Sequence, residues 1–165
     1  MVHVAVSGGG DADQETCRQA EALGRELARR SAVVVTGGLG GVMEAACRGA
    51  KAEGGTTIGI LPLDDRAGAN AWVDVAVPTG LGEGRNALVV RAADVVVAVA
   101  GGFGTLSEIA LALRLGRPVV GLGTWELAWR GEQVDAVVVA SSPADAAERA
   151  VNLASSSRSA PPRGS

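Results

Sequence analysis

The strongest constraint on the fold is a series of short, valine-rich runs separated by segments with helical spacing. Most of the runs are apolar at every position, which is typical of strands covered on both faces in a parallel sheet. A glycine-bearing turn and a helical pattern follow each run, and this alternation predicts βαβ units. The predicted strands are Val2–Ser7, Ala32–Thr36, Thr56–Leu61, Val73–Val77, Val95–Val99, Val119–Leu122 and Ala136–Val139.

The segments between the runs predict covering helices and complete the expected fold. These helices are Thr16–Arg30, Met43–Glu53, Asn86–Ala92, Leu106–Leu115 and a last one with Ser142 as N-cap and Pro143 at its first position. The class is therefore α/β, a Rossmann-like three-layer sandwich with a mostly parallel sheet of about seven strands. We expect a single domain over residues 1–154. Residues 155–165 are rich in Ser, Pro and Arg and predict a disordered tail.

Charge and composition argue against several classes of protein. The net charge of −3 and a pI of about 5.2 offer no clustered Lys and Arg for a nucleic-acid backbone, so no nucleic-acid partner is expected. No apolar stretch approaches the roughly 18 residues that cross a bilayer, so no membrane partner is expected either. The start, MVHVAVSGGG, is typical of a first strand and not of a signal peptide, which favours the cytoplasm.

The reactive side chains do not form a recognisable metal or disulfide pattern. Cys17 and Cys47 fall in predicted helices and are better explained as buried thiols than as a disulfide. His3 is the only histidine, and no Cys/His cluster has metal-ligand spacing. We therefore expect neither a metal site nor an organic cofactor.

The first informative loop joins the second predicted strand to a helix. It runs TGGLGGVME from Thr36 to Glu44, and its candidate ligand-binding residues are Gly37, Gly38, Gly40, Gly41, Met43 and Glu44. Closely spaced glycines let the backbone approach an anion, and the amides at a helix N-terminus favour negative charge. The alternative is a tight turn without a ligand, with Glu44 merely complementing the helix dipole.

Two further glycine loops are predicted at the same edge of the sheet. After the fifth strand come Gly101, Gly102, Phe103, Gly104 and Thr105, whose amides and hydroxyl are suited to a phosphate. At the end of the first strand comes the run Ser7-Gly8-Gly9-Gly10-Asp11, with Gly8 and Gly9 as candidate ligand contacts, which either completes the rim of the site or forms a flexible hairpin-like turn. In an open α/β sheet the carboxyl ends of the strands share one edge, where ligands bind.

Two charged residues are candidates for chemistry beside these loops. Glu108 lies three residues after Thr105, so it either closes a capping box or reaches a bound sugar. Arg85 precedes a predicted helix and either grips a phosphate or stays solvated. Trp125 and Trp129, spaced by four, line a base pocket, form a subunit contact or, as a helical pair of large apolar residues, simply cover the sheet edge.

Two common nucleotide-binding motifs are missing from the sequence. The phosphate loop GxxxxGK[ST] is absent because no glycine is followed by lysine. The dinucleotide fingerprint GxGxxG does not follow the first strand, and the second strand ends in Thr36 and Gly37 instead of an acidic residue. Nucleoside triphosphatase chemistry and NAD binding are therefore disfavoured.

The segments TGGLGGVMEAACRGA and GRNALVVRAADVVVAVAGGFGTLSEIALAL resemble the Lonely Guy proteins, historically labelled possible lysine decarboxylases. The resemblance covers roughly residues 2–139, and GGVMEAACRGAKAEGGTTIGILP is most similar to the branch that includes molybdenum cofactor carrier proteins. The family signature PGGxGTxxE is matched by Gly101, Gly102, Gly104, Thr105 and Glu108, and Arg85 matches an upstream arginine.

The resemblance implies hydrolysis of a nucleoside 5′-monophosphate to a free base and ribose 5-phosphate. Arg85 and Glu108 would be the catalytic pair, since a carboxylate stabilises an oxocarbenium-like transition state. Two departures, Ala100 in place of the signature proline and Asn86 in place of a basic residue, weigh against cytokinin-type specificity. The decarboxylase label is disfavoured because a pyridoxal enzyme needs a lysine that forms a Schiff base with the cofactor. The only lysine, Lys51, falls late in a predicted helix after the first glycine loop.

Two main hypotheses for function follow. The first is a phosphoribohydrolase, and the alternative is a non-catalytic carrier that holds a nucleotide or the molybdenum cofactor in the same cleft. A third interpretation is a regulatory dimer with a vestigial pocket. For the hydrolase and for the carrier alike, the expected partner is a nucleotide or another small phosphorylated molecule. The resemblance also implies a homodimer or higher homo-oligomer.

Overall fold

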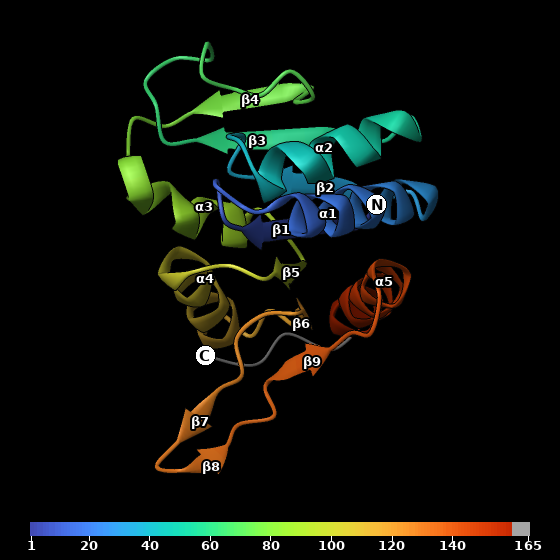
Figure 1. The fold of residues 1–165 in the computed structure, drawn as a ribbon, viewed down its shortest axis with the longest axis vertical. Coiled ribbons are helices and arrows are strands. Elements are labelled where there is room, and N and C mark those ends of the chain that lie inside the picture. The colour runs from blue at the N-terminus through green and yellow to red at the C-terminus, as the bar shows by residue number, and fades with distance from the viewer. Residues whose placement is uncertain (160–165) are drawn as a thin grey trace.

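The computed structural model describes residues 1–159 of the chain, and its centre is a seven-stranded sheet. The strand order is β4-β3-β2-β1-β5-β6-β9, and all neighbouring strands are parallel, which confirms the predicted fold class (Figure 1). The strands are β1 His3–Gly8, β2 Val33–Thr36, β3 Thr57–Leu61, β4 Val75–Pro78, β5 Val95–Val99, β6 Val119–Leu122 and β9 Val137–Val139.

Helices cover both faces of the sheet, as Figure 1 shows with the sheet seen edge-on. They are α1 Gln14–Arg29, α2 Val42–Ala52, the 3-10 turn η1 Gly82–Arg85, α3 Asn86–Arg91, α4 Phe103–Arg114 and α5 Pro143–Ser159. Helices α1, α2 and α5 lie on one face, and α3 and α4 lie on the other. This is the predicted three-layer arrangement.

The valine-rich runs are apolar throughout because each strand is buried on both faces. Along β5, Val95, Val97 and Val99 belong to the core under α1, α2 and α5. The alternate residues Val96 and Ala98 belong to the second core, under α3 and α4. Successive side chains of a strand point to opposite faces, so a central strand with a helix layer on each side needs no polar position.

Helices α1 and α2 pack closely through two glycines. A Cβ atom on Gly24 of α1 would collide with the backbone carbonyl of Ala46 in α2. A Cβ atom on Gly49 of α2 would likewise collide with the carbonyl of Glu21 in α1. Glycine thus permits direct contact between the two backbones, and this contact sets the position of α2 over β1 and β2.

Several predicted boundaries differ from the structure, most clearly at the start of α4 and in β4, whereas the predicted start of α5 is confirmed. Helix α4 begins at Phe103 and not at Leu106, because Gly102 serves as N-cap and Gly104 is accommodated in the first turn. Strand β4 occupies Val75–Pro78 instead of residues 73–77. Helix α5 begins at Pro143 after Ser142, whose hydroxyl accepts a hydrogen bond from the Asp145 amide, so that the predicted N-cap is confirmed.

The prediction of a disordered tail from residue 155 is wrong for residues 155–159, which continue α5. Ala150 and Ala154 are fully buried against the sheet and extend the packed face of the helix to this point. The hydroxyls of Ser155, Ser156 and Ser157 donate to carbonyls four residues earlier, so serine is accommodated within the helix. The remainder of the predicted tail, residues 160–165, lies outside the described residues.

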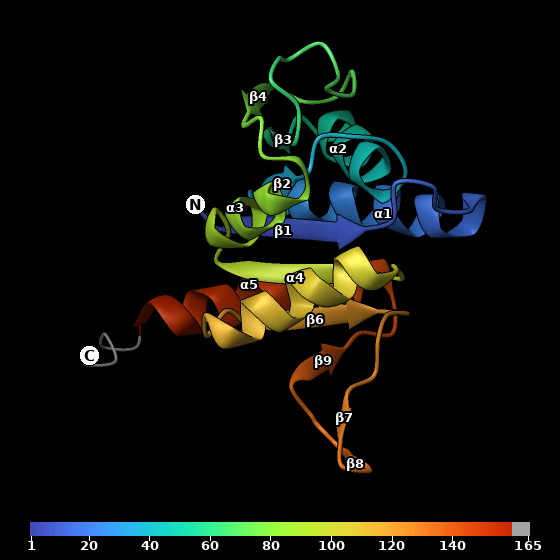
Figure 2. The same ribbon diagram turned by 90° about the vertical axis from the view of Figure 1, so that its left-hand side faces the viewer.

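Between β6 and β9 the chain forms a short antiparallel hairpin that projects from the body (Figure 2). Its strands are β7 Ala128–Trp129 and β8 Glu132–Gln133. The interpretation of Trp125 and Trp129 as a helical pair is therefore wrong, because this segment is extended. Cys47 is buried as predicted, whereas Cys17 is only partly buried, and both are free thiols. No helix within residues 1–159 is long and apolar enough to cross a membrane.

Candidate functional site

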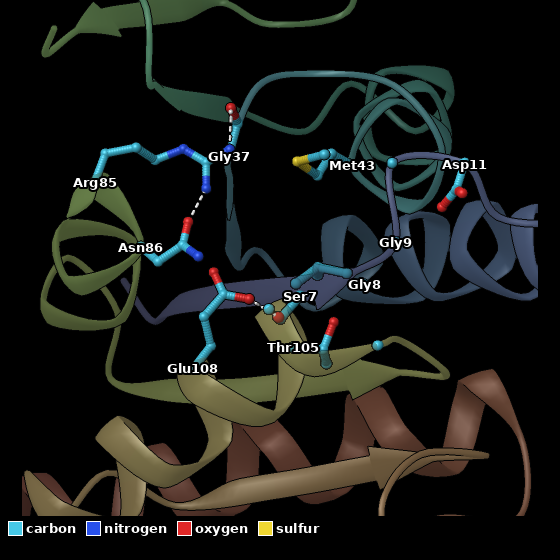
Figure 3. Close-up of a pocket in the computed structure, with 14 residues that line it drawn as sticks. Ser7, Gly8, Gly9, Asp11, Gly37, Met43, Arg85, Asn86, Thr105 and Glu108 are labelled. Atoms are coloured by element: carbon cyan, nitrogen blue, oxygen red, sulfur yellow. Dashed lines mark hydrogen bonds between the residues drawn. The ribbon is translucent and has the colours of Figure 1, made fainter. Parts of the chain in front are cut away.

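A cavity of about 260 Å³ opens at the carboxyl ends of β1 and β5, where the strand order changes direction. Chain segments on the two sides of this switch point diverge, and ligands of open α/β sheets bind in the resulting crevice. The lining comes from four places: the loop after β1, the loop after β2, the start of α3 and the first turns of α4 (Figure 3). These segments are far apart in the sequence.

The cavity brings together most of the residues that the sequence singled out. The predicted site residues on its wall are Gly8, Gly9, Gly37, Met43, Arg85, Gly102, Gly104, Thr105 and Glu108. Those that do not line it are Gly38, Gly40, Gly41, Glu44, Gly101 and Phe103. The wall also includes Ser7, Gly10 and Asp11, which belong to the same predicted rim loop as Gly8 and Gly9, and Val6 and Asn86, which the sequence analysis did not assign as ligand contacts.

The loop after β2 contributes less to the cavity than expected, for two structural reasons. Gly38 has a positive φ of 74° and packs against Leu61, away from the cavity. The amide of Val42, at the start of α2, donates to the Gly9 carbonyl at 3.0 Å. The expectation that the α2 N-terminus faces an anion is therefore wrong at this amide, which instead ties two glycine loops together. Met43 presents its thioether beside the cavity (Figure 3).

The start of α4 offers unused backbone donors to the cavity. Gly102 caps the helix without any side-chain hydrogen bond, and the Leu106 amide is the first to bond back, to the Gly102 carbonyl. The amides of the first three helical residues, 103–105, precede this bond and have no acceptor within the helix, so they are suited to bind a ligand. The helix dipole adds a partial positive charge at the same place.

Ala100 explains one departure from the family signature. Its φ is +46°, a left-handed conformation that proline, with φ near −65°, does not adopt. The Thr124 hydroxyl donates to the Ala100 carbonyl at 2.6 Å and holds this turn. The chain therefore reaches the start of α4 by a turn in which the signature proline would not fit.

Glu108 is a buried carboxylate on the floor of the cavity. It is only 8% exposed and accepts a hydrogen bond from the hydroxyl of Ser7, which is itself buried at the end of β1. Burial raises the pKa of Glu108, while the Ser7 hydrogen bond and the charge of Arg85 partly offset this. The capping-box alternative is wrong, because α4 begins at Phe103 and places Glu108 in its second turn.

Arg85 lies across the cavity from Glu108 and is also only 8% exposed, so the solvated alternative is wrong. One terminal nitrogen donates to the side-chain oxygen of Asn86, and the other donates to the Gly37 carbonyl at 3.3 Å. Its Nε is buried without a hydrogen-bond partner in the described part of the chain. Desolvation lowers the pKa of Arg85, and the charge of Glu108 opposes this shift.

Arg85 and Glu108 do not form an ion pair within 4.0 Å among residues 1–159, and Asn86 lies between them in Figure 3. Both residues line the cavity, so both can contact a ligand. The cavity presents a guanidinium and backbone amides to an anion and a carboxylate to a donor or a developing positive charge. Within the described residues no group of three or more His, Cys, Asp or Glu side chains is placed to hold a metal ion.

The sequence and fold of the chain are similar to those of known proteins. Residues 1–155 match the model of the SLOG cluster4 family. An uncharacterized protein of Archaeoglobus fulgidus is 41% identical over 122 residues, which is 74% of this chain and 80% of that protein.

Two solved structures are similar to this chain over nearly their whole length. The molybdenum cofactor binding protein from Rippkaea orientalis has a TM-score of 0.81 and 38% identity, over 96% of this chain and 98% of that one. The Moco carrier protein from Chlamydomonas reinhardtii has a TM-score of 0.81 and 35% identity, over 94% and 98% of the two chains. DNA processing protein A from Helicobacter pylori is less similar, with a TM-score of 0.60 and 25% identity over 80% and 68%.

Proposed function

The chain belongs to the SLOG cluster4 family, and from this premise we propose that it is a carrier protein for the molybdenum cofactor, a phosphorylated pterin. Membership confirms the resemblance to the Lonely Guy superfamily that the glycine motifs indicated. The cofactor is here a cargo, held through its phosphate in the cavity between Arg85 and the first turn of α4. Two similar structures bear the names of proteins that bind or carry this cofactor.

One observation carries the proposal more than any other, and it is the buried Nε of Arg85 without a partner. A buried charged group normally has its donors satisfied, because an unpaired one loses its hydration without compensation. Arg85 lines the cavity, and no carboxylate within residues 1–159 forms an ion pair with it. A phosphate would satisfy the guanidinium and the α4 amides together, as arginine and helix N-termini do in other phosphate sites.

Glu108 supports a second candidate function, the hydrolysis of a nucleoside 5′-monophosphate. Its carboxylate is in the cavity, and only Ser7 donates to it among the described residues. A carboxylate beside a bound ribose stabilises an oxocarbenium-like transition state. The same contact also suits a carrier, in which Glu108 accepts hydrogen bonds from the ligand. We favour the carrier because full-length structural relatives bind or carry a cofactor.

The similarity to DNA processing protein A raises the question of a nucleic-acid ligand. The chain has a net charge of −3, and the cavity is about 260 Å³, a size suited to a small molecule. We propose a small phosphorylated ligand and no DNA strand. Fluorescence anisotropy with a labelled single-stranded oligonucleotide at physiological salt is expected to show no binding.

The proposal is tested by incubating the protein with molybdenum cofactor under anaerobic conditions and separating it by gel filtration. We expect molybdenum and phosphate to elute with the protein in equal amounts. A parallel incubation with AMP, followed by chromatography of the products, is expected to release no adenine. Free adenine together with a protein peak that contains no molybdenum would reject the carrier function and support the hydrolase function.

A further inference from the structure

A second hollow lies next to the Arg85–Glu108 cavity and shares two lining residues with it. It has a volume of about 530 Å³ and is lined by Glu83, Gly84, Asn86, Phe103, Gly104 and Ser107. Asn86 and Gly104 also line the first cavity, so the two hollows meet at these residues. We call the second hollow the side groove, and it is the neighbouring space toward which a ligand held in the first cavity can extend.

Phe103 is the one aromatic side chain on the wall of the side groove. It is the first residue of α4 and is 81% exposed, an unusual position for so apolar a residue. Trp125 lies beside it, with ring centroids 5.6 Å apart and a tilt of 37°. The Trp125 indole donates to the Gly102 carbonyl at 3.1 Å, so Trp125 is tied to the same turn and supports the Phe103 ring. The ring is thus held in place with most of its surface open.

Asn86 adds a polar contact where the two hollows meet. Its side-chain oxygen accepts from Arg85, which fixes the orientation of the amide. Its side-chain nitrogen has no acceptor within the part of the chain that the structure describes, and it is therefore free to donate. The geometry places an aromatic surface and an oriented amide donor next to a phosphate site.

We propose that the side groove binds the planar heterocycle of the phosphorylated ligand, stacked on Phe103 and hydrogen-bonded by the Asn86 amide. This inference rests on the proposed phosphate site. It adds a binding site for the ring of the ligand, which the phosphate site does not contact. Stacking on an aromatic side chain tolerates different rings, whereas the amide requires an acceptor on the ring edge. Phe103 is thus a specificity-determining residue for planar ring systems over simple sugar phosphates.

The test compares ligands with and without a ring in calorimetric titrations. The probes are molybdenum cofactor, AMP and ribose 5-phosphate, and the variants are Phe103→Leu, which keeps an apolar side chain, and Phe103→Trp, which keeps an aromatic one. Trp129→Ala, on the distant hairpin, is the matched control for loss of an exposed aromatic residue. Gel filtration of each variant monitors its oligomeric state.

We expect Phe103→Leu to weaken binding of the ring-containing probes by roughly 5- to 30-fold and to leave ribose 5-phosphate unchanged. Phe103→Trp and Trp129→Ala should bind like the wild type. Three results would contradict binding of the ring in the side groove: an equal loss of affinity of Phe103→Leu for all three probes, no loss for any probe, or a changed oligomeric state with unchanged affinity. A wild type that ignores molybdenum cofactor but binds AMP in a Phe103-dependent way would reject the carrier function and keep the stacking site. If no probe binds the wild type, both proposals fall.

Discussion

Ser7, at the end of β1, donates a hydrogen bond to the carboxylate of Glu108 in α4, across 101 positions of the sequence. The bond joins the two strand-to-helix connections that flank the switch point of the sheet. It holds a buried carboxylate on the floor of the cavity, opposite the guanidinium of Arg85. The charge pattern of the site therefore depends on a contact between segments that only the fold brings together.

The raised pKa of Glu108 predicts a specific pH dependence of stability. The ordinary value is 4.5, and burial raises it in the folded protein. Above about pH 4.5 the folded protein therefore keeps a proton that the unfolded chain has released, so this group's contribution to stability falls as pH rises through the folded-state pKa. The side chain of the Glu108→Gln variant does not titrate. The free energy of unfolding of this variant should therefore increase relative to that of the wild type as pH rises through this range.

The measurement is thermal unfolding of the wild type and Glu108→Gln at pH 5 and pH 8. We expect the variant to unfold higher at pH 8, by roughly 2–4 °C for each kcal/mol of relieved desolvation, with a smaller difference at pH 5. The other carboxylates are the same in both proteins and cancel in the comparison. Parallel pH profiles would mean that the Glu108 carboxyl is not perturbed.

Replacing Arg85 by methionine separates binding from stability. Removing a buried charge that lacks full hydrogen bonding relieves its desolvation, so the free energy of unfolding should change by less than about 1 kcal/mol. The affinity for phosphorylated ligands should fall, because the charged donors are lost. Urea unfolding measures the first quantity and calorimetry the second. A collapse of stability with retained affinity would assign Arg85 to the fold and not to the ligand.

Gly37→Ala should weaken ligand binding through Arg85. A Cβ atom at this position would collide with the guanidinium of Arg85 and lie 2.8 Å from the sulfur of Met43. The arginine must then move, and we expect a loss of affinity of roughly tenfold. Asn152→Ala on the exposed surface of α5 is the control and should bind normally. Wild-type affinity in Gly37→Ala would show that the Gly37 contact does not position Arg85.

Gly24→Ala and Gly49→Ala should destabilise the fold, although alanine is the better helix former. Each added methyl group would meet a backbone carbonyl of the facing helix, and overpacking of this kind costs roughly 1–3 kcal/mol. Helix propensity alone predicts the opposite sign, a gain of about 1 kcal/mol. Urea unfolding decides between them, and a stabilised variant would mean that α1 and α2 have room to separate.

Much of the fold followed from the sequence because its signals are local. Strands such as Val95–Val99 are apolar on both faces, and each glycine turn marks a strand end. Parallel topology then requires the loops at Gly8, Gly37 and Gly102 to share one edge, and the structure places them on one cavity. The roles of these residues in binding remain predictions.

The features that the sequence did not reveal depend on tertiary contacts. The amide of Val42 is occupied by the Gly9 carbonyl, and nothing in the local pattern indicates that partner. The pairing of Phe103 with Trp125 joins the start of α4 to the loop after β6. Residues 155–159 have a tail-like composition, yet they extend a helix whose alanines are buried against the sheet. Local composition cannot report such packing.

Calorimetric titration of the molybdenum cofactor into the wild type and Arg85→Met tests most directly whether the Arg85 cavity binds the phosphate of this cofactor. We expect saturable binding at one site per chain in the wild type and an affinity lower by roughly tenfold or more in the variant. Absence of binding to the wild type, or equal affinity in the two proteins, would contradict this expectation.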